Sequence, residues 1–141
     1  MSALKTKDGI APGKIMYHVY GTVLAKRRHK LTEDNIDVHI ERCIITSFPK
    51  YYHYSLSTRT DSLFVDCIMF GTMGEFRSGF SLKDCGIGNK KNYNLNRLFT
   101  SIGDAREFIG EIMEGKFFDV EEQMLYNEEK YYYDICNSIT L

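Results

Sequence analysis

The order of two hydrophobic periodicities along the chain constrains its fold more than any other feature. Apolar residues alternate with polar ones through much of residues 14–82, which is the period of β-strands. From residue 101 onward they recur every three or four positions, which is the period of an α-helix. Strands first and helices last predict an α+β domain, with an antiparallel sheet of about five strands and two C-terminal helices packed on one face.

Five extended segments are predicted from the alternation and from the turn residues between them. They cover residues 15–24, 36–45, 51–57, 63–70 and 75–82. The alternation slips near Arg42, which predicts a β-bulge in the second segment. The fourth is apolar on both faces, which is typical of a central strand, and residues 71–74 are expected to form the hairpin after it.

A polar loop is predicted over residues 83–97, and a helix is predicted after it. Ser101 is a good N-cap with Asp104 three residues later, and Gly115 is placed to end this first helix. A second helix is predicted from Asp119. Its expected buried stripe is Val120, Met124, Tyr131 and Ile135, and its expected water-facing residues are Glu121, Glu122, Glu128 and Glu129.

The 141 residues suit a single domain. We expect residues 1–13 to form a flexible basic arm and residues 14–141 to form one α+β domain. The N-terminus lacks a secretory signal and no run is long enough to span a membrane, so a cytoplasmic protein is predicted. The four cysteines are Cys43, Cys67, Cys85 and Cys136, and their spacing matches neither a metal site nor a redox motif. We therefore expect reduced thiols and expect no bound metal or cofactor.

Charge is distributed very unevenly along the chain. Residues 1–30 have a net charge of +6 and residues 104–134 a net charge of −7, although the whole chain has a formal charge of −1. Opposite poles favour complementary association. The basic region is therefore expected to meet the acidic helix of a second copy, giving a homo-oligomer. Alternatively, the acidic helix mimics nucleic-acid charge and blocks a basic site on another protein.

Tyrosine is abundant, with ten residues in the chain, and its amphipathic ring suits contact surfaces. Three consecutive tyrosines, residues 131–133, cannot all face one core from a helix, so at least one ring should be exposed. Together with the charged clusters they give a predicted interaction surface. It consists of Lys26, Arg27, Arg28, Lys30, Tyr52, Tyr54, Glu128, Glu129 and Tyr132.

Three weaker signals in the sequence each have both a functional and a structural interpretation. An anion site is an alternative for the loop that contains Gly86, Gly88, Lys90 and Lys91, although no phosphate-binding motif is matched and a surface loop is favoured. Strand alternation places His18 on the same face as Tyr20, His39 on the same face as Glu41 and His53 on the same face as Ser55. If these strands are neighbours, the residues could form a cluster for general-base chemistry. The favoured alternative is a solvated face of the sheet. Asp66 is expected to pair with Arg77.

No catalytic motif stands out, so the sequence favours a non-enzymatic protein that self-associates and binds or inhibits another macromolecule. Its size and composition are typical of a small viral or bacteriophage accessory protein. One alternative is a sheet that binds single-stranded nucleic acid through the basic cluster and tyrosines, although the acidic C-terminal third would oppose this. The remaining alternative is a nucleotide- or small-ligand-binding protein. No membrane partner is expected.

Overall fold

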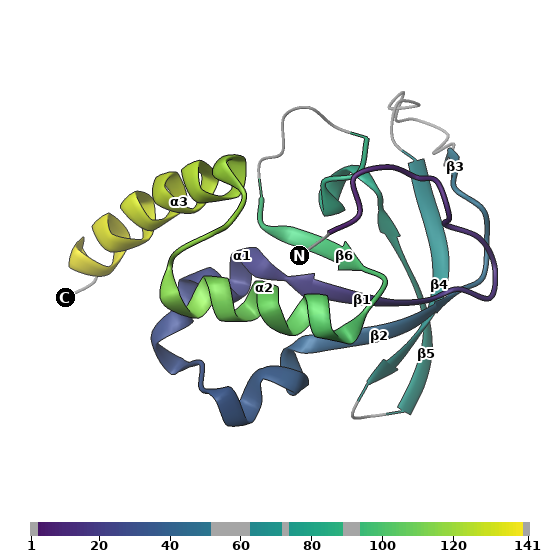
Figure 1. Ribbon diagram of the computed structural model, residues 1–141, viewed down its shortest axis with the longest axis horizontal. Helices are drawn as coiled ribbons and strands as arrows, with labels where there is room; N and C mark the ends of the chain where they lie inside the picture. Colours follow the sequence, from purple (N-terminus) through teal and green to yellow (C-terminus); the bar gives the residue numbers. More distant parts are fainter. Residues whose placement is uncertain (1–2, 52–62, 72–73, 89–93, 140–141) are drawn as a thin grey trace.

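The predicted sheet is present in the computed structural model, which describes residues 3–51, 63–71, 74–88 and 94–139 (Figure 1). Within these residues, six antiparallel strands and C-terminal helices give the α+β fold that the sequence predicts. The strands are β1 (Ile15–Tyr20), β2 (Ile40–Ile45), β3 (Lys50–Tyr51), β4 (Leu63–Gly71), β5 (Gly74–Ser81) and β6 (Asn96–Phe99). The α-helices are α1 (Gly21–Lys26), α2 (Ile102–Glu114) and α3 (Val120–Ile139). The side chains of residues 132, 133 and 135–139 lie outside the description.

β4 is an interior strand with partners on both edges, in keeping with its two apolar faces. β5 pairs along β4 from Phe64 opposite Ser81 to Gly71 opposite Gly74, closing the predicted hairpin. β2 and β3 pair with successive stretches of the other edge of β4. β1 pairs with the other edge of β2, and β6 pairs with the other edge of β1. Across the sheet the order is therefore β5, β4, β2, β1 and β6, and β3 lies beside β4 on the same edge as β2.

The sheet is strongly curved and divides the core into two clusters. The ring centroids of His18 on β1 and Phe80 on β5 are 5.4 Å apart, although two strands separate these strands. Three strand spacings in a flat sheet would span about 14 Å. The concave side contains one hydrophobic cluster, to which Met16 and Leu98 belong. The neighbouring residues Val19 and Phe99 point to the other side, where α1 and α2 cover the second cluster.

The N-terminal segment is not a loose arm, because it packs on the edge of the sheet and contributes to both hydrophobic clusters. Ala3 and Ile10 are buried in the two hydrophobic clusters. The backbone N–H of Leu4 donates to the Leu98 carbonyl at the β6 edge (2.9 Å), and that of Gly13 donates to the Ile45 carbonyl (2.8 Å). These contacts fix residues 3–13 to the sheet.

The first predicted strand ends earlier than expected because α1 replaces its second half. A Cβ atom on Gly21 would lie 2.0 Å from the Leu95 carbonyl oxygen, so only glycine allows this close approach. The backbone N–H of Leu95 also donates to the Thr22 hydroxyl (3.0 Å). Contacts with a segment more than 70 residues away therefore turn the chain into a helix.

The second predicted strand is also shorter, because Glu33–His39 form a 3-10 helix. The backbone N–H of Thr32 donates to the Asn35 side chain (3.0 Å), which closes the first turn. Val38, an apolar residue of the predicted strand, is 71% exposed. The predicted bulge is absent: β1 and β2 pair in continuous register through Arg42. The slip in alternation marks the change from 3-10 helix to strand.

The sequence did not predict β6. Its Asn96 and Arg97 are polar and extend the predicted loop, yet they pair with Tyr20 and Val19 of β1. The third predicted strand is represented by β3, and the rest of its predicted span lies outside the described residues.

The prediction for α2 is confirmed at both ends. The Ser101 side chain accepts a hydrogen bond from the Asp104 backbone N–H (3.2 Å). Gly115 ends the helix with a left-handed φ of 70°. Between them, Ala105, Phe108, Ile109 and Ile112 are fully buried. Among the described residues, no helix combines the length and apolarity that crossing a bilayer requires.

Candidate interaction surface

α3 begins where the sequence predicts, with Asp119 as its N-cap. The Asp119 carboxylate accepts hydrogen bonds from the backbone N–H groups of Glu121 (2.9 Å) and Glu122 (3.1 Å). Gln123 then fastens the first turn to the preceding linker. Its side chain accepts from the Phe117 N–H (2.7 Å) and donates to the Gly115 carbonyl (3.1 Å). The first turn is therefore held by polar contacts.

The buried side of α3 is formed by Glu122 and Tyr126. The Arg97 Nε donates to the Glu122 carboxylate (2.8 Å), and both side chains are almost fully buried. The Tyr126 ring packs on Phe117, with centroids 5.3 Å apart. This ring extends an aromatic chain that runs through Phe108 to Phe99 on β6.

The predicted buried stripe of α3 is wrong, because its apolar residues face outward. Val120 is 73% exposed, Met124 60% and Tyr131 64%. Phe118, in the linker before the helix, is 88% exposed. Arg97 supplies the physical reason. A buried guanidinium requires an anionic partner, so the side of α3 that carries Glu122 turns inward together with Leu125 and Tyr126, and the side that carries Val120 and Met124 turns out.

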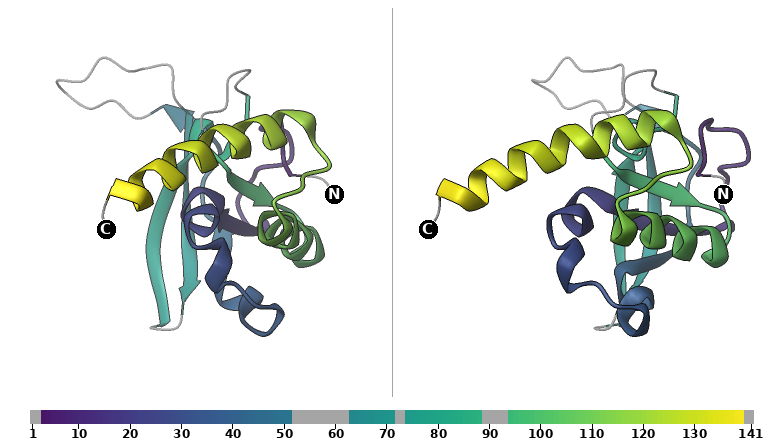
Figure 2. Two further views of the ribbon diagram at one scale, coloured as in Figure 1. Left: turned by 90° about the vertical axis from the view of Figure 1, so that its left-hand side faces the viewer. Right: turned by 60° about the vertical axis from the view of Figure 1, so that its left-hand side comes forward.

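Three of these exposed residues lie along one side of α3 and have acidic flanks. Val120, Met124 and Tyr131 recur at i, i+4 and i+11, which is one side of a helix with about 3.6 residues per turn. The same periodicity places Glu121 and Glu128 along one flank and Asp134 along the other, and all three are exposed. Figure 2 shows α3 extending beyond the sheet and the other helices. We define this surface, with Phe118, as the α3 stripe.

The basic and acidic poles meet within one chain. An Arg28 guanidinium nitrogen lies 3.8 Å from the Asp134 carboxylate, and the guanidinium carbon lies 5.9 Å from the centre of the Tyr126 ring. Lys5 also lies 3.7 Å from Asp119 at the start of α3. Part of the charge expected to attract a second copy is thus satisfied internally.

The other predicted interaction residues are distributed around this contact. Lys26, at the end of α1, and Arg27 and Lys30 beyond it are exposed. Glu128 is exposed and Glu129 is half-buried. Exposure of Tyr131 confirms that at least one ring of the tyrosine run faces solvent. Tyr52, Tyr54 and the side chain of Tyr132 lie outside the described residues.

α2 and α3 also bring two carboxyl groups close together. The Oε2 atoms of Glu111 and Glu122 are both buried and have no hydrogen-bond partner. Burial, and secondarily the charge of Glu122, raise the pKa of Glu111 to about 7. The contact between the two helices is therefore sensitive to the protonation of Glu111.

The backbone of the predicted anion loop is already hydrogen-bonded where it is described. The N–H of Gly86 donates to the Lys83 carbonyl and that of Gly88 to the Lys5 carbonyl, both at 3.0 Å. An anion here would have to be bound by side chains. Lys90 and Lys91 lie outside the described residues, so their role stays a prediction.

Of the predicted histidine cluster, the structure brings together His18, Tyr20 and Glu41. The His18 Nδ1 lies 3.3 Å from the Glu41 carboxylate, and the Tyr20 ring meets the His18 ring edge-on. His39 belongs to the 3-10 helix before β2, and His53 lies outside the described residues.

Three of the four cysteines belong to the same concave core. Cys43, Cys67 and Cys85 are buried and free, as expected for reduced thiols. A hydrogen bond with Cys67 and burial raise the pKa of Cys43, and burial raises the pKa of Cys85 to about 12. The described residues contain no group of three side chains placed to hold a metal ion.

Asp66 has a different ion-pair partner from the one predicted. Its carboxylate lies 2.6 Å from the Lys50 amine of β3. Arg77 is opposite Ile68, and Asp66 is opposite Gly79. The sequence identified the need for a cation but not its source, because the pairing of β3 with β4 is not a local property.

Comparison with known proteins provides a family but no close relative. No curated protein and no solved structure matches the chain. Residues 4–112 match the family described as "Phage g100-like protein". This span contains all six strands and nearly all of α2, and it leaves α3 outside. The match agrees with the expected bacteriophage character. The chain therefore belongs to the phage g100-like protein family.

Proposed function

We propose that this chain is a non-enzymatic binding protein that docks the α3 stripe on another protein. One observation carries the proposal: Val120 and Met124 of α3 face away from the core, while the buried side of the helix holds Glu122 and Tyr126. Exposed large apolar side chains with a polar border are typical of an interaction site. The strong exposure of Phe118, Val120 and Met124 supports a partner protein as their cover.

The chemistry of the α3 stripe specifies the partner. Apolar side chains require an apolar groove, and the carboxylates of Glu121 and Glu128 favour a cationic rim. A second copy would place two acidic helices side by side if it paired through the same stripe. Its basic cluster is also a weaker partner, because Arg28 already contacts its own α3. The acidic helix thus suits inhibition of a protein whose groove normally receives an anionic ligand.

The nucleic-acid alternative is less well supported. Arg28, the centre of the predicted basic patch, contacts Asp134, and the exposed carboxylates of α3 lie close to the same surface. They would repel a phosphate backbone. Tyr52 and Tyr54, the proposed stacking residues, lie outside the described residues.

Site-specific photo-crosslinking followed by binding measurements tests the proposal. A photoreactive phenylalanine analogue replaces Met124 to trap the partner, and the same analogue at Val38 is the control because that side chain is equally accessible but lies on a different surface. The trapped protein is then purified and titrated with unmodified chain. We expect Met124→Ala to weaken binding about tenfold, Val38→Ala to leave it unchanged, and added salt to weaken it further.

Two outcomes contradict the proposal. Crosslinks from position 124 to a second copy of the chain alone would assign the stripe to self-association. A purified partner that binds Met124→Ala as tightly as the unmodified chain would show that the stripe is not the docking surface.

A further inference from the structure

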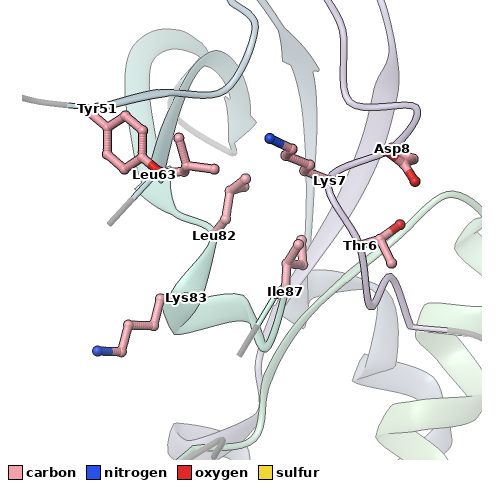
Figure 3. Close-up of a pocket in the computed structure, with 9 residues that line it drawn as sticks. Thr6, Lys7, Asp8, Tyr51, Leu63, Leu82, Lys83 and Ile87 are labelled. Carbon is pink, nitrogen blue, oxygen red and sulfur yellow. The ribbon is translucent and has the colours of Figure 1, made fainter. Parts of the chain in front are cut away.

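The structure also contains a cavity that is independent of the α3 stripe. It has a volume of about 540 Å³ and lies where the N-terminal segment, the end of β3, the start of β4 and the turn after β5 meet (Figure 3). Cavities of a few hundred cubic ångströms are typical of small-molecule sites. Four segments distant in sequence are needed to form it.

Apolar side chains form one part of its wall. Leu63, Leu82 and Ile87 line the cavity, and Leu82 and Ile87 are also members of the concave hydrophobic cluster. This part of the wall is therefore continuous with the core. It can accept an aliphatic or aromatic group without leaving polar atoms unpaired.

A lysine extends over this apolar wall. In Figure 3 the Lys7 side chain points toward Leu82 and Leu63, whereas the Asp8 carboxylate points away from them. Among the described residues, no carboxylate lies within ion-pair distance of Lys7. The Tyr51 hydroxyl lies beside Leu63 and provides a second hydrogen-bonding group.

We propose that this cavity binds a small organic anion with a compact apolar body. The body packs on Leu63, Leu82 and Ile87, and a carboxylate or phosphate monoester accepts hydrogen bonds from Lys7 and Tyr51. Gly88 lines the cavity, but its N–H donates to the Lys5 carbonyl, so side chains rather than backbone hold the anion. Lys83 is also part of the lining, but its amine points away from Lys7 and Leu82 in Figure 3.

Ligand titration of the full chain by NMR and by thermal shift tests this inference. The probes are benzoate, hexanoate, phenyl phosphate, inorganic phosphate and benzyl alcohol. We expect saturable binding of an anion that carries an apolar body, at least tenfold tighter than benzyl alcohol or inorganic phosphate. Comparison of benzoate with phenyl phosphate distinguishes the carboxylate from the phosphate ester.

Matched lysine variants locate the binding. Lys7→Met keeps the apolar stem and removes the charge, so it should weaken binding of the best probe at least tenfold. Lys14→Met is the control because Lys14 is exposed and does not line the cavity. Tyr51→Phe should weaken binding severalfold. The inference is overturned if no anionic probe saturates, or if Lys7→Met and Lys14→Met behave alike.

Discussion

α2 and α3 are neighbouring helices that use opposite chemistry to attach to the same sheet. α2 buries an apolar side made of Ala105, Phe108, Ile109 and Ile112, and its exposed side is polar. α3 buries Glu122 and Tyr126 and exposes Val120 and Met124. Both helices have a capping side chain at the N-terminus, Ser101 or Asp119. The difference lies in the side that faces the sheet.

This contrast separates two roles for apolar residues. In α2 the apolar residues are buried in the core, where their burial stabilises the domain. In α3 the buried ion pair of Arg97 and Glu122 adds to the packing of Leu125 and Tyr126, while Val120 and Met124 stay exposed. The family match stops within the last turn of α2, so the shared region holds the core while α3 carries the exposed stripe.

The largest expected effect comes from removing the anchor of α3. Arg97→Met leaves the buried Glu122 carboxylate without its cation, because Arg97 donates to it at 2.8 Å. Loss of one partner of a buried ion pair costs roughly 3–5 kcal/mol of unfolding free energy. Urea denaturation measures the change. The control is Arg106→Met: Arg106 forms two hydrogen bonds with Asp37, but both side chains are exposed, so the loss should be much smaller. Equal losses would show that the buried pair is not the anchor.

A smaller but still large effect is expected from the apolar side of α2. Ile112→Ala removes a fully buried side chain and should lower the unfolding free energy by about 3 kcal/mol. Denaturant titration of the purified variant provides the measurement. A loss as small as that of an exposed residue would mean that α2 is less firmly packed than its burial indicates.

An intermediate effect is expected from pH, because the interface between α2 and α3 holds Glu111. Its pKa is raised from 4.5 to about 7, so the folded chain binds this proton more tightly than the unfolded chain. This contribution to stability is fully present below pH 4.5 and is lost as the pH rises toward 7. Glu111→Gln should remove that pH dependence and stabilise the chain above pH 7. Tm values measured between pH 5 and pH 8 test this; parallel curves for the two proteins would contradict it.

The smallest effect on stability is expected on the α3 stripe. Met124→Ala should change the unfolding free energy by less than about 0.5 kcal/mol, because the side chain is exposed. Denaturation of this variant beside Ile112→Ala gives the direct comparison of the two helices. A loss of several kcal/mol would show that the stripe contributes to folding and is not free for a partner.

Local signals in the sequence predicted the elements that depend on local contacts. Ser101 and Gly115 bound α2 because a cap acts within one helical turn. The hairpin of β4 and β5 follows from alternation on both sides of a glycine turn. The same reasoning failed at α1, since the close approach of Gly21 to Leu95 joins residues far apart in the chain. It also missed β6, whose polar residues become a strand only by pairing with β1.

The candidate site shows the same limit. The sequence predicted that α3 begins at Asp119, that it is acidic and that a tyrosine of its run is exposed. It did not predict that the apolar side faces outward, or that Arg28 contacts α3 of its own chain. A helical period identifies two sides of a helix but does not say which one is buried.

The amino-acid sequence by itself determined the α+β class, the interior place of β4, the caps of α2 and the start of α3, because each depends on neighbouring residues or on a short period. Only the tertiary structure decided the curvature of the sheet, the packing of the N-terminal segment and the orientation of α3. The physical reason is that a buried charge must find its partner. Arg97 and Glu122 satisfy that requirement across 25 residues of sequence, and their pairing overrides the simpler rule that apolar sides turn inward.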